Sequence, residues 1–144
     1  MDRPLVVLDP ATPGGAWARE HLASDIVGWL TTVAPNGTPQ SSVVAFLWDG
    51  ESVLLYSQPD APKVRNIAAN PRVAFHLQSD PHGMHMLTLE GNATPDETAA
   101  AGDALDAYLV KQRDAYGRWG MDPQVALREY SLPIRIRPTR IRAF

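Results

Sequence analysis

Short runs of apolar and β-branched residues, separated by turn residues, recur along most of the chain. Runs of this kind and length predict β-strands. The pattern predicts six strands, over residues 26–34, 40–48, 52–58, 72–79, 84–93 and 132–144. Pro35-Asn36-Gly37-Thr38 and Asp49-Gly50 separate the first three, and Asn-Gly and Asp-Gly pairs supply the positive φ angles that tight hairpin turns need.

Two of these strands have an unusual pattern. In 40–48 both alternating faces become apolar away from the turn, so we expect this strand to be covered on both sides. In 132–144 the apolar positions change parity from Ile134 and Ile136 to Ile141 across Pro138. This change predicts an edge position or a β-bulge.

Helices are predicted at four places, over 15–23, within 60–71, over 94–113 and over 123–129. The second has Pro62 at its first position and ends at Asn70-Pro71. The third starts at Thr94-Pro95-Asp96-Glu97, which has the spacing of a capping box with proline at the first helical position. The first helix precedes all the predicted strands, and the other three lie between strands.

The order of these elements predicts a mainly β fold, a six-stranded antiparallel barrel with flanking helices. A parallel nucleotide-binding sheet is disfavoured because it needs a helix after nearly every strand, and the chain has no G-x-G-x-x-G motif. Neither an internal repeat nor a long linker divides the chain. We therefore expect a single domain over residues 1–144.

Composition narrows the classes of protein that fit. The 144 residues contain no cysteine, which excludes disulfides, thiolate metal sites and thiol nucleophiles and agrees with a cytoplasmic location. The first thirty positions hold Asp2, Asp9 and Glu20 instead of a basic start and an apolar run, so we expect neither a signal peptide nor a membrane span. A net charge of −3 argues against a nucleic-acid partner.

The basic residues are unevenly placed. Of eleven arginines, Arg135, Arg137, Arg140 and Arg142 fall within the last ten residues with no acidic residue among them. Such a cluster either binds an anion or keeps an exposed strand edge soluble, and both interpretations stay open at this point.

Lys63 is the most informative single position. It falls at the start of the short helix predicted within 60–71, where a cation faces the positive end of the helix dipole at a cost of a few tenths to about 1 kcal/mol. An anion bound by Lys63, by the free N–H groups of the first turn and by Arg65 or Asn66 would remove this conflict, which suits a phosphate. The alternative is an exposed lysine that extends into water.

Polar side chains follow two neighbouring strand ends. Gln40, Ser41 and Ser42 come after the first hairpin turn, and the run Tyr56-Ser57-Gln58 precedes the Lys63 helix. Hydroxyl and amide groups of this kind suit a heteroaromatic ring with carbonyl edges. They are also common as simple polar residues near loops.

Several of these segments, in this order, resemble the pyridoxamine 5′-phosphate oxidase-like split β-barrel family. The most specific part is Lys63-Val64-Arg65-Asn66-Ile67 followed by Asn70-Pro71-Arg72-Val73-Ala74. The other parts are residues 29–33, 36–44 and 54–57. Within the family, the chain is most similar to the small actinobacterial flavin/deazaflavin oxidoreductases that use coenzyme F420, and FMN is the alternative cofactor.

The resemblance implies a homodimer with cofactor sites between the subunits. It implies that the strand with Gln40, Ser41, Ser42 and Val43 lines the ring, near Tyr56, Ser57 and Gln58, and that Lys63, Arg65 and Asn66 hold the phosphate. Some relatives have a further basic residue where this chain has Ala61 and Pro62. Either phosphate affinity is lower here, or Arg140 and Arg142 of the partner chain contribute.

The implied reaction is hydride transfer from the reduced ring to a small unsaturated or electrophilic acceptor. A proton could come from Tyr56, Ser57, His76 or solvent, and the sequence selects no catalytic residue. A non-catalytic F420 carrier or storage protein is the alternative from another functional class. For the acceptor site, the irregular segments 80–86 and 117–122 are candidates.

Two other groups of residues have simpler interpretations. Asp80, His82 and His85 have a spacing that could bind a metal, but Pro81 and Gly83 favour a surface turn, so no metal site is expected. The four tryptophans, Trp17, Trp29, Trp48 and Trp119, are expected in the core or at a dimer interface rather than as platforms for bases.

Overall fold

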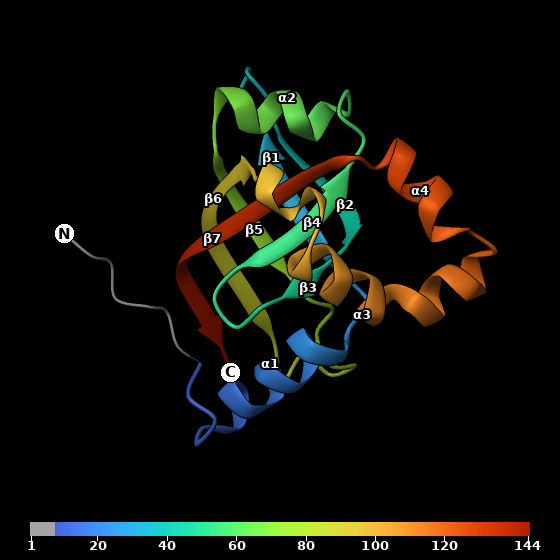
Figure 1. Ribbon diagram of the computed structural model, residues 1–144. Helices are drawn as coiled ribbons and strands as arrows, with labels where there is room; N and C mark the ends of the chain where they lie inside the picture. Colours follow the sequence, from blue (N-terminus) through green and yellow to red (C-terminus); the bar gives the residue numbers. More distant parts are fainter. Residues whose placement is uncertain (1–7) are drawn as a thin grey trace.

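The computed structural model describes residues 8–144 as one curled antiparallel sheet with flanking helices (Figure 1). The sheet order is β2-β1-β5-β6-β7-β4-β3. The strands are β1 Val27–Val33, β2 Pro39–Ala45, β3 Leu47–Trp48, β4 Val53–Ser57, β5 Arg72–His76, β6 Leu87–Pro95 and β7 Leu132–Ala143. The sheet curls into a half-barrel, which confirms the predicted mainly β fold of the split-barrel type.

The number of strands differs from the prediction because the run 40–48 forms two strands. It breaks at Phe46, which is fully buried and packs edge-to-face on Phe75 with ring centroids 5.1 Å apart. Before the break β2 pairs with β1, and after it β3 pairs with β4. These consecutive strands therefore lie at opposite ends of the sheet order, and the chain between them brings the two ends together.

Both predicted hairpin turns form, with a different backbone from the expected one. Positive φ occurs at Gly37 (88°) and Gly50 (97°) but not at Asn36 or Asp49. In the first turn the Gly37 N–H donates to the Ala34 carbonyl oxygen at 2.8 Å, so glycine alone supplies the left-handed conformation.

The parity change in the last strand is a β-bulge. Glu90 pairs with Arg140 whereas Gly91 pairs with Pro138, so Thr139 is the extra residue. Since β7 lies between β6 and β4, it is not an edge strand. The interpretation of the C-terminal arginines as protectors of a sheet edge is therefore wrong.

The helices are α1 Pro13–Ser24, α2 Pro62–Ala69, the 3-10 helix η1 Glu97–Ala100, α3 Asp103–Trp119 and α4 Pro123–Glu129. The predictions for α1, α2 and α4 are confirmed, and the single helix expected over 94–113 is wrong. Thr94 and Pro95 stay paired with β7, and Asp96 instead caps η1. Gly102, with φ of 85°, then separates η1 from α3, which continues past Arg113 until Gly120 ends it in the left-handed conformation.

The helices occupy three sides of the barrel. Figure 1 shows α2 at one end, α1 at the opposite end, and α3 with α4 as an arm on one side. Most buried apolar side chains form one cluster inside the barrel, among them Leu30, Phe46, Leu55, Phe75, Leu89, Ile134 and Ile136. A second, smaller cluster of Leu54, Tyr56, Ala99 and Tyr108 joins the sheet to η1 and α3.

The burial of Val43 and of the tryptophans can be compared with the predictions from sequence. Val43 is 50% exposed, so the expectation that this strand is covered on both faces is wrong for the single chain. Trp17 and Trp48 pack against the core, whereas Trp119 is 48% exposed.

Within residues 8–144 no helix is long and apolar enough to cross a membrane. Asp2, which contributes to the signal-peptide argument, lies outside the described residues.

Candidate functional site

A polar cavity of about 470 Å³ lies where the N-terminus of α2 meets β1 and β2. It is lined by Thr32, Gln40, Ser41, Ser42, Ala61, Pro62 and Lys63. The hairpin β1–β2 supplies the hydroxyl and amide groups, and the first turn of α2 supplies the cation. The polar residues of β2 and the lysine of α2 therefore share one cavity.

Asn66 holds this cavity in shape from the inner side of α2. Its side chain is 5% exposed, and its amide nitrogen donates to Thr32 Oγ1 at 2.9 Å and to Gln40 Oε1 at 2.8 Å. On the other face of the same hairpin, the hydroxyls of Thr31 and Ser41 lie 2.7 Å apart. The two Asn66 bonds fix the hairpin relative to α2, so Asn66 acts by positioning Gln40.

Lys63 is a half-buried cation, and burial lowers its pKa below the usual range. No carboxylate of residues 8–144 forms an ion pair with it. The positive end of the α2 dipole adds to this potential, because Ala61 at the N-cap carries no polar side chain, although Pro62 has no N–H and the Val64 N–H donates to the Ala61 carbonyl oxygen at 3.0 Å. An anion in the cavity would satisfy the lysine and the helix terminus together.

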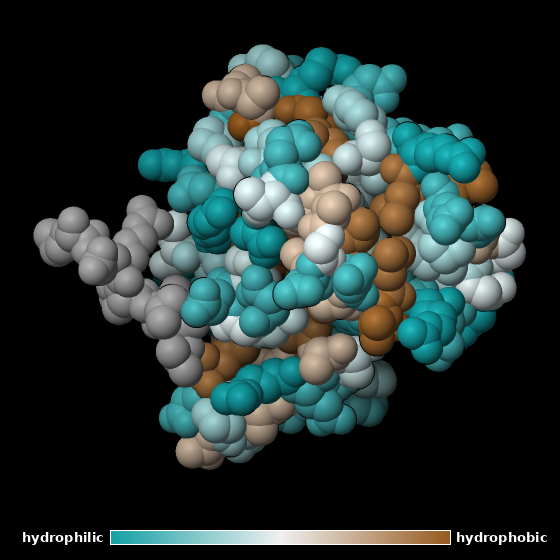
Figure 2. All heavy atoms as spheres, in the orientation of Figure 1, coloured by the Kyte–Doolittle hydropathy of each residue, from teal (hydrophilic) through white to brown (hydrophobic). Residues whose placement is uncertain are grey.

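A second cavity, of about 260 Å³, lies on the other side of Lys63 between the sheet and the α3–α4 arm. It is lined by Val43, Val44, Ala45, Tyr56, Lys63, Tyr108, Tyr116, Trp119, Met121, Ala126 and Tyr130. Figure 2 shows a band of hydrophobic surface between the barrel and this arm. Lys63 thus separates a polar cavity from an apolar, aromatic one.

Burial affects the phenols of Tyr56, Tyr108 and Tyr116, which line the second cavity. Burial raises the pKa of Tyr56 to about 12, and it also raises the pKa values of Tyr108 and Tyr116. The Tyr56 hydroxyl donates to the Ala99 carbonyl oxygen at 2.6 Å, and its ring packs edge-on against Tyr108 at 4.6 Å. Tyr56 is therefore committed to the packing of η1 and α3.

The structure brings six of the ten predicted site residues to these cavities. Gln40, Ser41, Ser42 and Lys63 line the polar cavity, and Val43, Tyr56 and Lys63 line the apolar one. Asn66 lies behind the first cavity, as described above.

The remaining three point elsewhere. The Arg65 guanidinium is exposed and donates to the Asp60 carbonyl oxygen at 2.8 Å, in the loop before α2. Ser57 is fully buried, and its hydroxyl donates to the Gln58 carbonyl oxygen at 3.0 Å. Neither Ser57 nor Gln58 lines a cavity described above. His76, a candidate proton donor, stacks on Trp29 at 6.3 Å and is also absent from both linings.

Several lining residues were not singled out from sequence, namely Thr32, Tyr116, Ala126 and Tyr130. Tyr108, Gln112 and Tyr116 recur at helical spacing and would have indicated that α3 continues beyond Arg113. Of the two segments expected near the acceptor, 117–122 contributes Trp119 and Met121 to the apolar cavity. The segment 80–86 lines neither cavity.

The Asp80 loop forms a turn through its own backbone. The Asp80 carboxylate accepts hydrogen bonds from the N–H groups of Met84 at 2.7 Å and His85 at 3.2 Å. In the part of the chain that the structure describes, no group of three metal-ligating side chains comes together.

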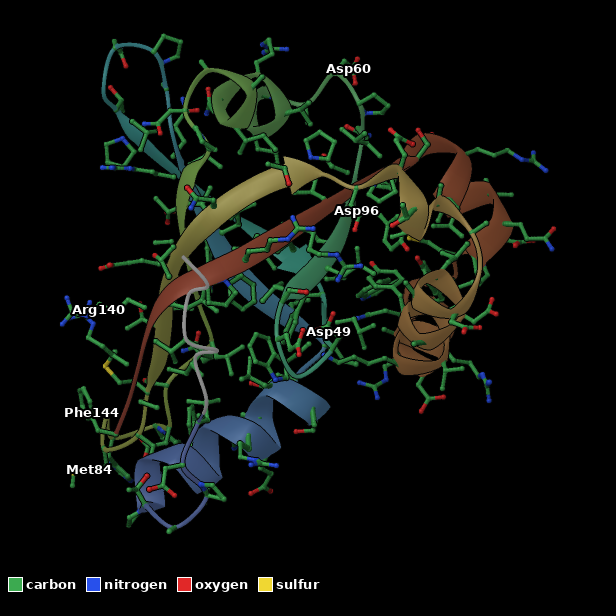
Figure 3. The ribbon with its side chains drawn as sticks, turned by 60° about the vertical axis from the view of Figure 1, so that its left-hand side comes forward. Asp49, Asp60, Met84, Asp96, Arg140 and Phe144 are labelled. Carbon is green, nitrogen blue, oxygen red and sulfur yellow. The ribbon has the colours of Figure 1, made fainter. Side chains whose placement is uncertain are left out.

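The C-terminal arginines do not form one anion site within the chain. Arg135 is held by the carboxylates of Asp49 and Asp96, at 2.9 and 2.7 Å, and Arg137 donates to the Thr94 hydroxyl at 3.1 Å. Figure 3 shows Arg140 pointing outward from β7, on the side away from α3 and α4. Of these four arginines, Arg140 and Arg142 therefore remain available to another molecule.

Comparison with known proteins agrees with this architecture. The sequence model of the family described as pyridoxamine 5′-phosphate oxidase matches residues 17–144. The pyridoxine/pyridoxamine 5′-phosphate oxidase of Bradyrhizobium diazoefficiens is 36% identical over 101 residues, which are 68% of this chain and 45% of that protein. The chain therefore spans less than half the length of this curated relative.

Two solved structures are similar over most of the chain. An F420 reductase is 30% identical, with a TM-score of 0.64, over 86% of this chain and 94% of that one. A heme binding protein from Mycobacterium smegmatis is 28% identical, with a TM-score of 0.62, over 88% of this chain and 52% of that one. Proteins described by different ligands thus share the fold.

Proposed function

The chain belongs to the pyridoxamine 5′-phosphate oxidase family, an oxidoreductase-type family of flavin-binding proteins, and from this premise we propose that it is an F420-dependent reductase. The proposed reaction is transfer of a hydride from the reduced deazaflavin to a small unsaturated or electrophilic organic acceptor. The observation that carries the proposal is Lys63, a half-buried cation that lacks a carboxylate partner in residues 8–144 and lies between a polar and an apolar cavity.

The residues present fit a phosphate-bearing cofactor. Lys63 and the N-terminus of α2 would hold the phosphate, since an ammonium group and the positive end of the helix dipole both favour an anion. Gln40, Ser41 and Ser42 would direct hydroxyl and amide groups at the polar edge of the ring system. Asn66 would keep Gln40 in place through the bond at 2.8 Å.

The cofactor, when bound, supplies the hydride chemistry, and the protein supplies position and electrostatics. The positive potential at Lys63 would orient the cofactor tail, and the neighbouring apolar cavity would exclude water from the reacting edge. Tyr56 is a poor proton source, because its hydroxyl is used by Ala99 and its pKa is raised to about 12. Solvent therefore supplies the proton in our proposal.

F420 is preferred over FMN for two reasons. The order of motifs from Trp29 to Ala74 resembles the F420-dependent branch, and the F420 reductase structure is similar over nearly its whole length. FMN remains the alternative cofactor of the same site, and a carrier of F420 without turnover is the alternative activity.

We also propose a homodimer in which a second copy completes the site. The outer face of β2 is open at Val43, and beside it a hollow of about 640 Å³ crosses the outer face of β1, β5 and β6. Arg140 and Arg142 of the second copy would then be available to the cofactor phosphate. A stable monomer with full cofactor affinity in sedimentation experiments would contradict this part of the proposal.

The test is a side-by-side binding titration of purified protein, stripped of cofactor, with F420, FMN and hemin, read by fluorescence or absorbance. We expect F420 to bind most tightly, and Lys63→Ala to weaken its binding at least tenfold. Lys111→Ala is the matched control, because it removes the only other lysine without touching either cavity. Unchanged F420 and FMN affinity in Lys63→Ala would overturn the phosphate assignment.

Further outcomes separate the alternatives. Preferential FMN binding would move the protein to the flavin branch, and preferential hemin binding would remove the hydride-transfer proposal. If F420 binds tightly but its reduced form is not reoxidised by any acceptor in a screen, the protein is a carrier. Reoxidation by an unsaturated or electrophilic acceptor is the expected result.

A further inference from the structure

We propose that the polar cavity selects oxyanions that carry no hydroxyl hydrogen, such as phosphate esters, over inorganic phosphate, and that Asn66 sets this selectivity. The inference rests on the proposed function and specifies the chemistry of its phosphate site. Lys63, Gln40 and Thr32 are among the residues that line the cavity, and the last two are both bonded to Asn66. Each of these three lining residues faces a ligand as a hydrogen-bond donor.

Asn66 determines which end of the Gln40 side chain faces the cavity. The Asn66 nitrogen Nδ2 donates to Gln40 Oε1 at 2.8 Å, and it also donates to Thr32 Oγ1 at 2.9 Å. The Gln40 carbonyl oxygen is therefore held toward α2. The Gln40 amide nitrogen, which carries two N–H donors, has no acceptor among residues 8–144 and is available to a ligand in the cavity.

The Thr32 hydroxyl is a second donor. It is buried, and its oxygen accepts the bond from Asn66, which leaves the hydroxyl hydrogen for another acceptor. No oxygen atom of residues 8–144 accepts this hydrogen. Because Thr32 lines the cavity, an oxygen atom of a bound ligand can accept it. A buried hydroxyl without an acceptor is unfavourable, so binding of such a ligand is strengthened.

The charged group of the cavity is also a donor. The Lys63 ammonium has N–H donors and no lone pair, and no carboxylate lines the cavity. The hydroxyls of Ser41 and Ser42 can donate or accept, and that of Ser41 already shares a hydrogen bond of 2.7 Å with Thr31. The lining side chains thus include fixed donors but no fixed acceptor.

A cavity lined by donors distinguishes oxyanions by the hydrogens that they carry. Sulfate and a fully ionised phosphate ester present only acceptor oxygens, so each fixed donor can be satisfied. Inorganic phosphate near neutral pH carries at least one P–OH hydrogen, which would meet other donors in the cavity. A polar group left unpaired in this way lowers affinity. Since F420 and FMN both carry their phosphate as an ester, the cavity would favour either cofactor over free phosphate.

The test compares three small anions and needs no turnover. Protein without cofactor is titrated by calorimetry at pH 8 with sulfate, inorganic phosphate and methyl phosphate, which all carry a charge of about −2 at this pH. The charge state of Lys63 is the same in the three titrations, so it cancels in the ratio of affinities. We expect sulfate and methyl phosphate each to bind about fivefold to tenfold more tightly than inorganic phosphate.

Asn66→Asp is expected to reverse the orientation of the Gln40 amide. A carboxylate at position 66 can only accept, so it would take hydrogen bonds from the Thr32 hydroxyl and the Gln40 amide nitrogen. The Gln40 carbonyl oxygen would then face the cavity and accept a P–OH hydrogen. Affinity for all three anions should fall because of the added negative charge, and the preference for sulfate over inorganic phosphate should disappear.

Gln40→Glu is the second variant, because Gln40 is exposed and its replacement disturbs the fold less than that of buried Asn66. Its carboxylate also gives the cavity an acceptor, so the same loss of preference is expected. Asn70→Asp is the matched control, since it makes the same chemical change on the C-terminal side of α2, outside the lining. Asn70 accepts from the Arg72 N–H at 3.1 Å, which aspartate can also do, so this variant should keep the wild-type ratio. Thermal unfolding of each variant checks that the fold is retained.

The outcomes distinguish this inference from the proposed function. If the wild-type protein binds inorganic phosphate as tightly as sulfate, or if a folded Asn66→Asp or Gln40→Glu variant keeps the wild-type ratio, the selectivity assignment is wrong. The F420 titration with Lys63→Ala then still decides the proposed function. Binding of F420 without binding of any of the three anions would also overturn the inference. The expected anion preference without F420 or FMN binding would overturn the proposed function instead.

Discussion

The side-chain amide of Asn66 on α2 donates to the side-chain carbonyl of Gln40 on β2 at 2.8 Å and to the hydroxyl of buried Thr32 at 2.9 Å. One buried amide thereby connects α2, which carries Lys63, to both strands of the β1–β2 hairpin. This hairpin carries the polar row, which consists of Gln40, Ser41 and Ser42. This contact makes the shape of the polar cavity depend on a residue that does not line it.

Asn66→Ala should therefore affect both stability and cofactor binding. It removes two hydrogen bonds and leaves Thr32, which is 2% exposed, without this partner. An unsatisfied buried polar group costs about 1–3 kcal/mol, and we expect the free energy of unfolding in urea to fall by that amount. Arg65→Ala on the same helix is the control and should change it by about 0.5 kcal/mol or less, because Arg65 is exposed. Equal urea midpoints for the two variants would show that the Asn66 bonds contribute little.

Cofactor affinity should decrease at alkaline pH because of Lys63. An anion is attracted by the protonated amine, which is present below its pKa, and burial lowers that pKa from the usual value. Affinity should thus begin to fall at a lower pH than expected for an exposed lysine. Lys63→Arg should remove this decrease, since a guanidinium stays protonated throughout. Fluorescence titrations of the wild-type protein and of Lys63→Arg at a series of pH values would measure the two affinities. Parallel pH profiles for these two proteins would exclude Lys63 as the titrating group.

The sequence predicts those parts of the fold in which local chemistry and tertiary pairing agree. Pro62, Asn70-Pro71 and Pro123 mark helix ends that the structure confirms, and the parity change across Pro138 is the bulge at Thr139. The capping-box pattern at Thr94 fails because pairing with β7 extends β6 through Pro95. Here the hydrogen-bonded pairing of β6 with β7 outweighs the local helix signal. The spacing of apolar residues along the chain contains no information about which strands pair.

The candidate site is predictable to a similar extent. Lys63 and the polar row could be predicted because the signals for each lie in neighbouring residues of the sequence. The structure places them in one cavity. Arg65 was predicted to hold the phosphate together with Lys63, but its side chain turns to the Asp60 carbonyl oxygen. The apolar cavity was missed because Val43, Tyr56 and Tyr116 are far apart in the chain and meet only when α3 packs on the sheet.

Stability at acidic pH should depend on Arg135, which bridges Asp49 and Asp96 at 2.9 and 2.7 Å. The hydrogen bond from Arg135 is the main reason why the pKa of Asp96 is lowered, and a lowered carboxylate pKa stabilises the fold above the unfolded value of about 3.9. This stabilisation is lost as the pH falls through the folded value. Arg135→Met should lower the free energy of unfolding by about 1.5–3 kcal/mol at pH 7 and flatten its acidic decline.

The control for Arg135 lies on the same strand. Arg137 is exposed and bonds only the Thr94 hydroxyl, so Arg137→Met should unfold like the wild-type protein. Chemical denaturation of the three proteins between pH 3 and 7 makes the comparison. An acidic decline of unchanged steepness in Arg135→Met would mean that other carboxylates determine it.

At alkaline pH the relevant group is Lys111, whose amine lies 3.6 Å from the centroid of the Phe46 ring. Burial lowers its pKa to about 8. Between this value and the unfolded pKa of about 10.4, the unfolded chain binds more protons than the folded one, so the free energy of unfolding rises with pH. Lys111→Met should abolish this rise, as measured by urea denaturation from pH 7 to 10. A rise that persists in the variant would have to come from another group.

Gly91, at the bulge between β6 and β7, tests how closely the two strands approach. A Cβ atom at this position would lie 2.5 Å from the Arg137 carbonyl oxygen, so Gly91→Ala requires the backbone to move. Overpacking of this kind costs about 1–3 kcal/mol, and we expect the thermal midpoint to fall accordingly. Gly117 on α3 is the matched control, because a Cβ there meets nothing within 4 Å. Gly117→Ala should raise stability by about 0.5–1 kcal/mol, since alanine is the better helix former. If both variants shift the midpoint in the same direction, the close approach at the bulge is not what requires glycine at position 91.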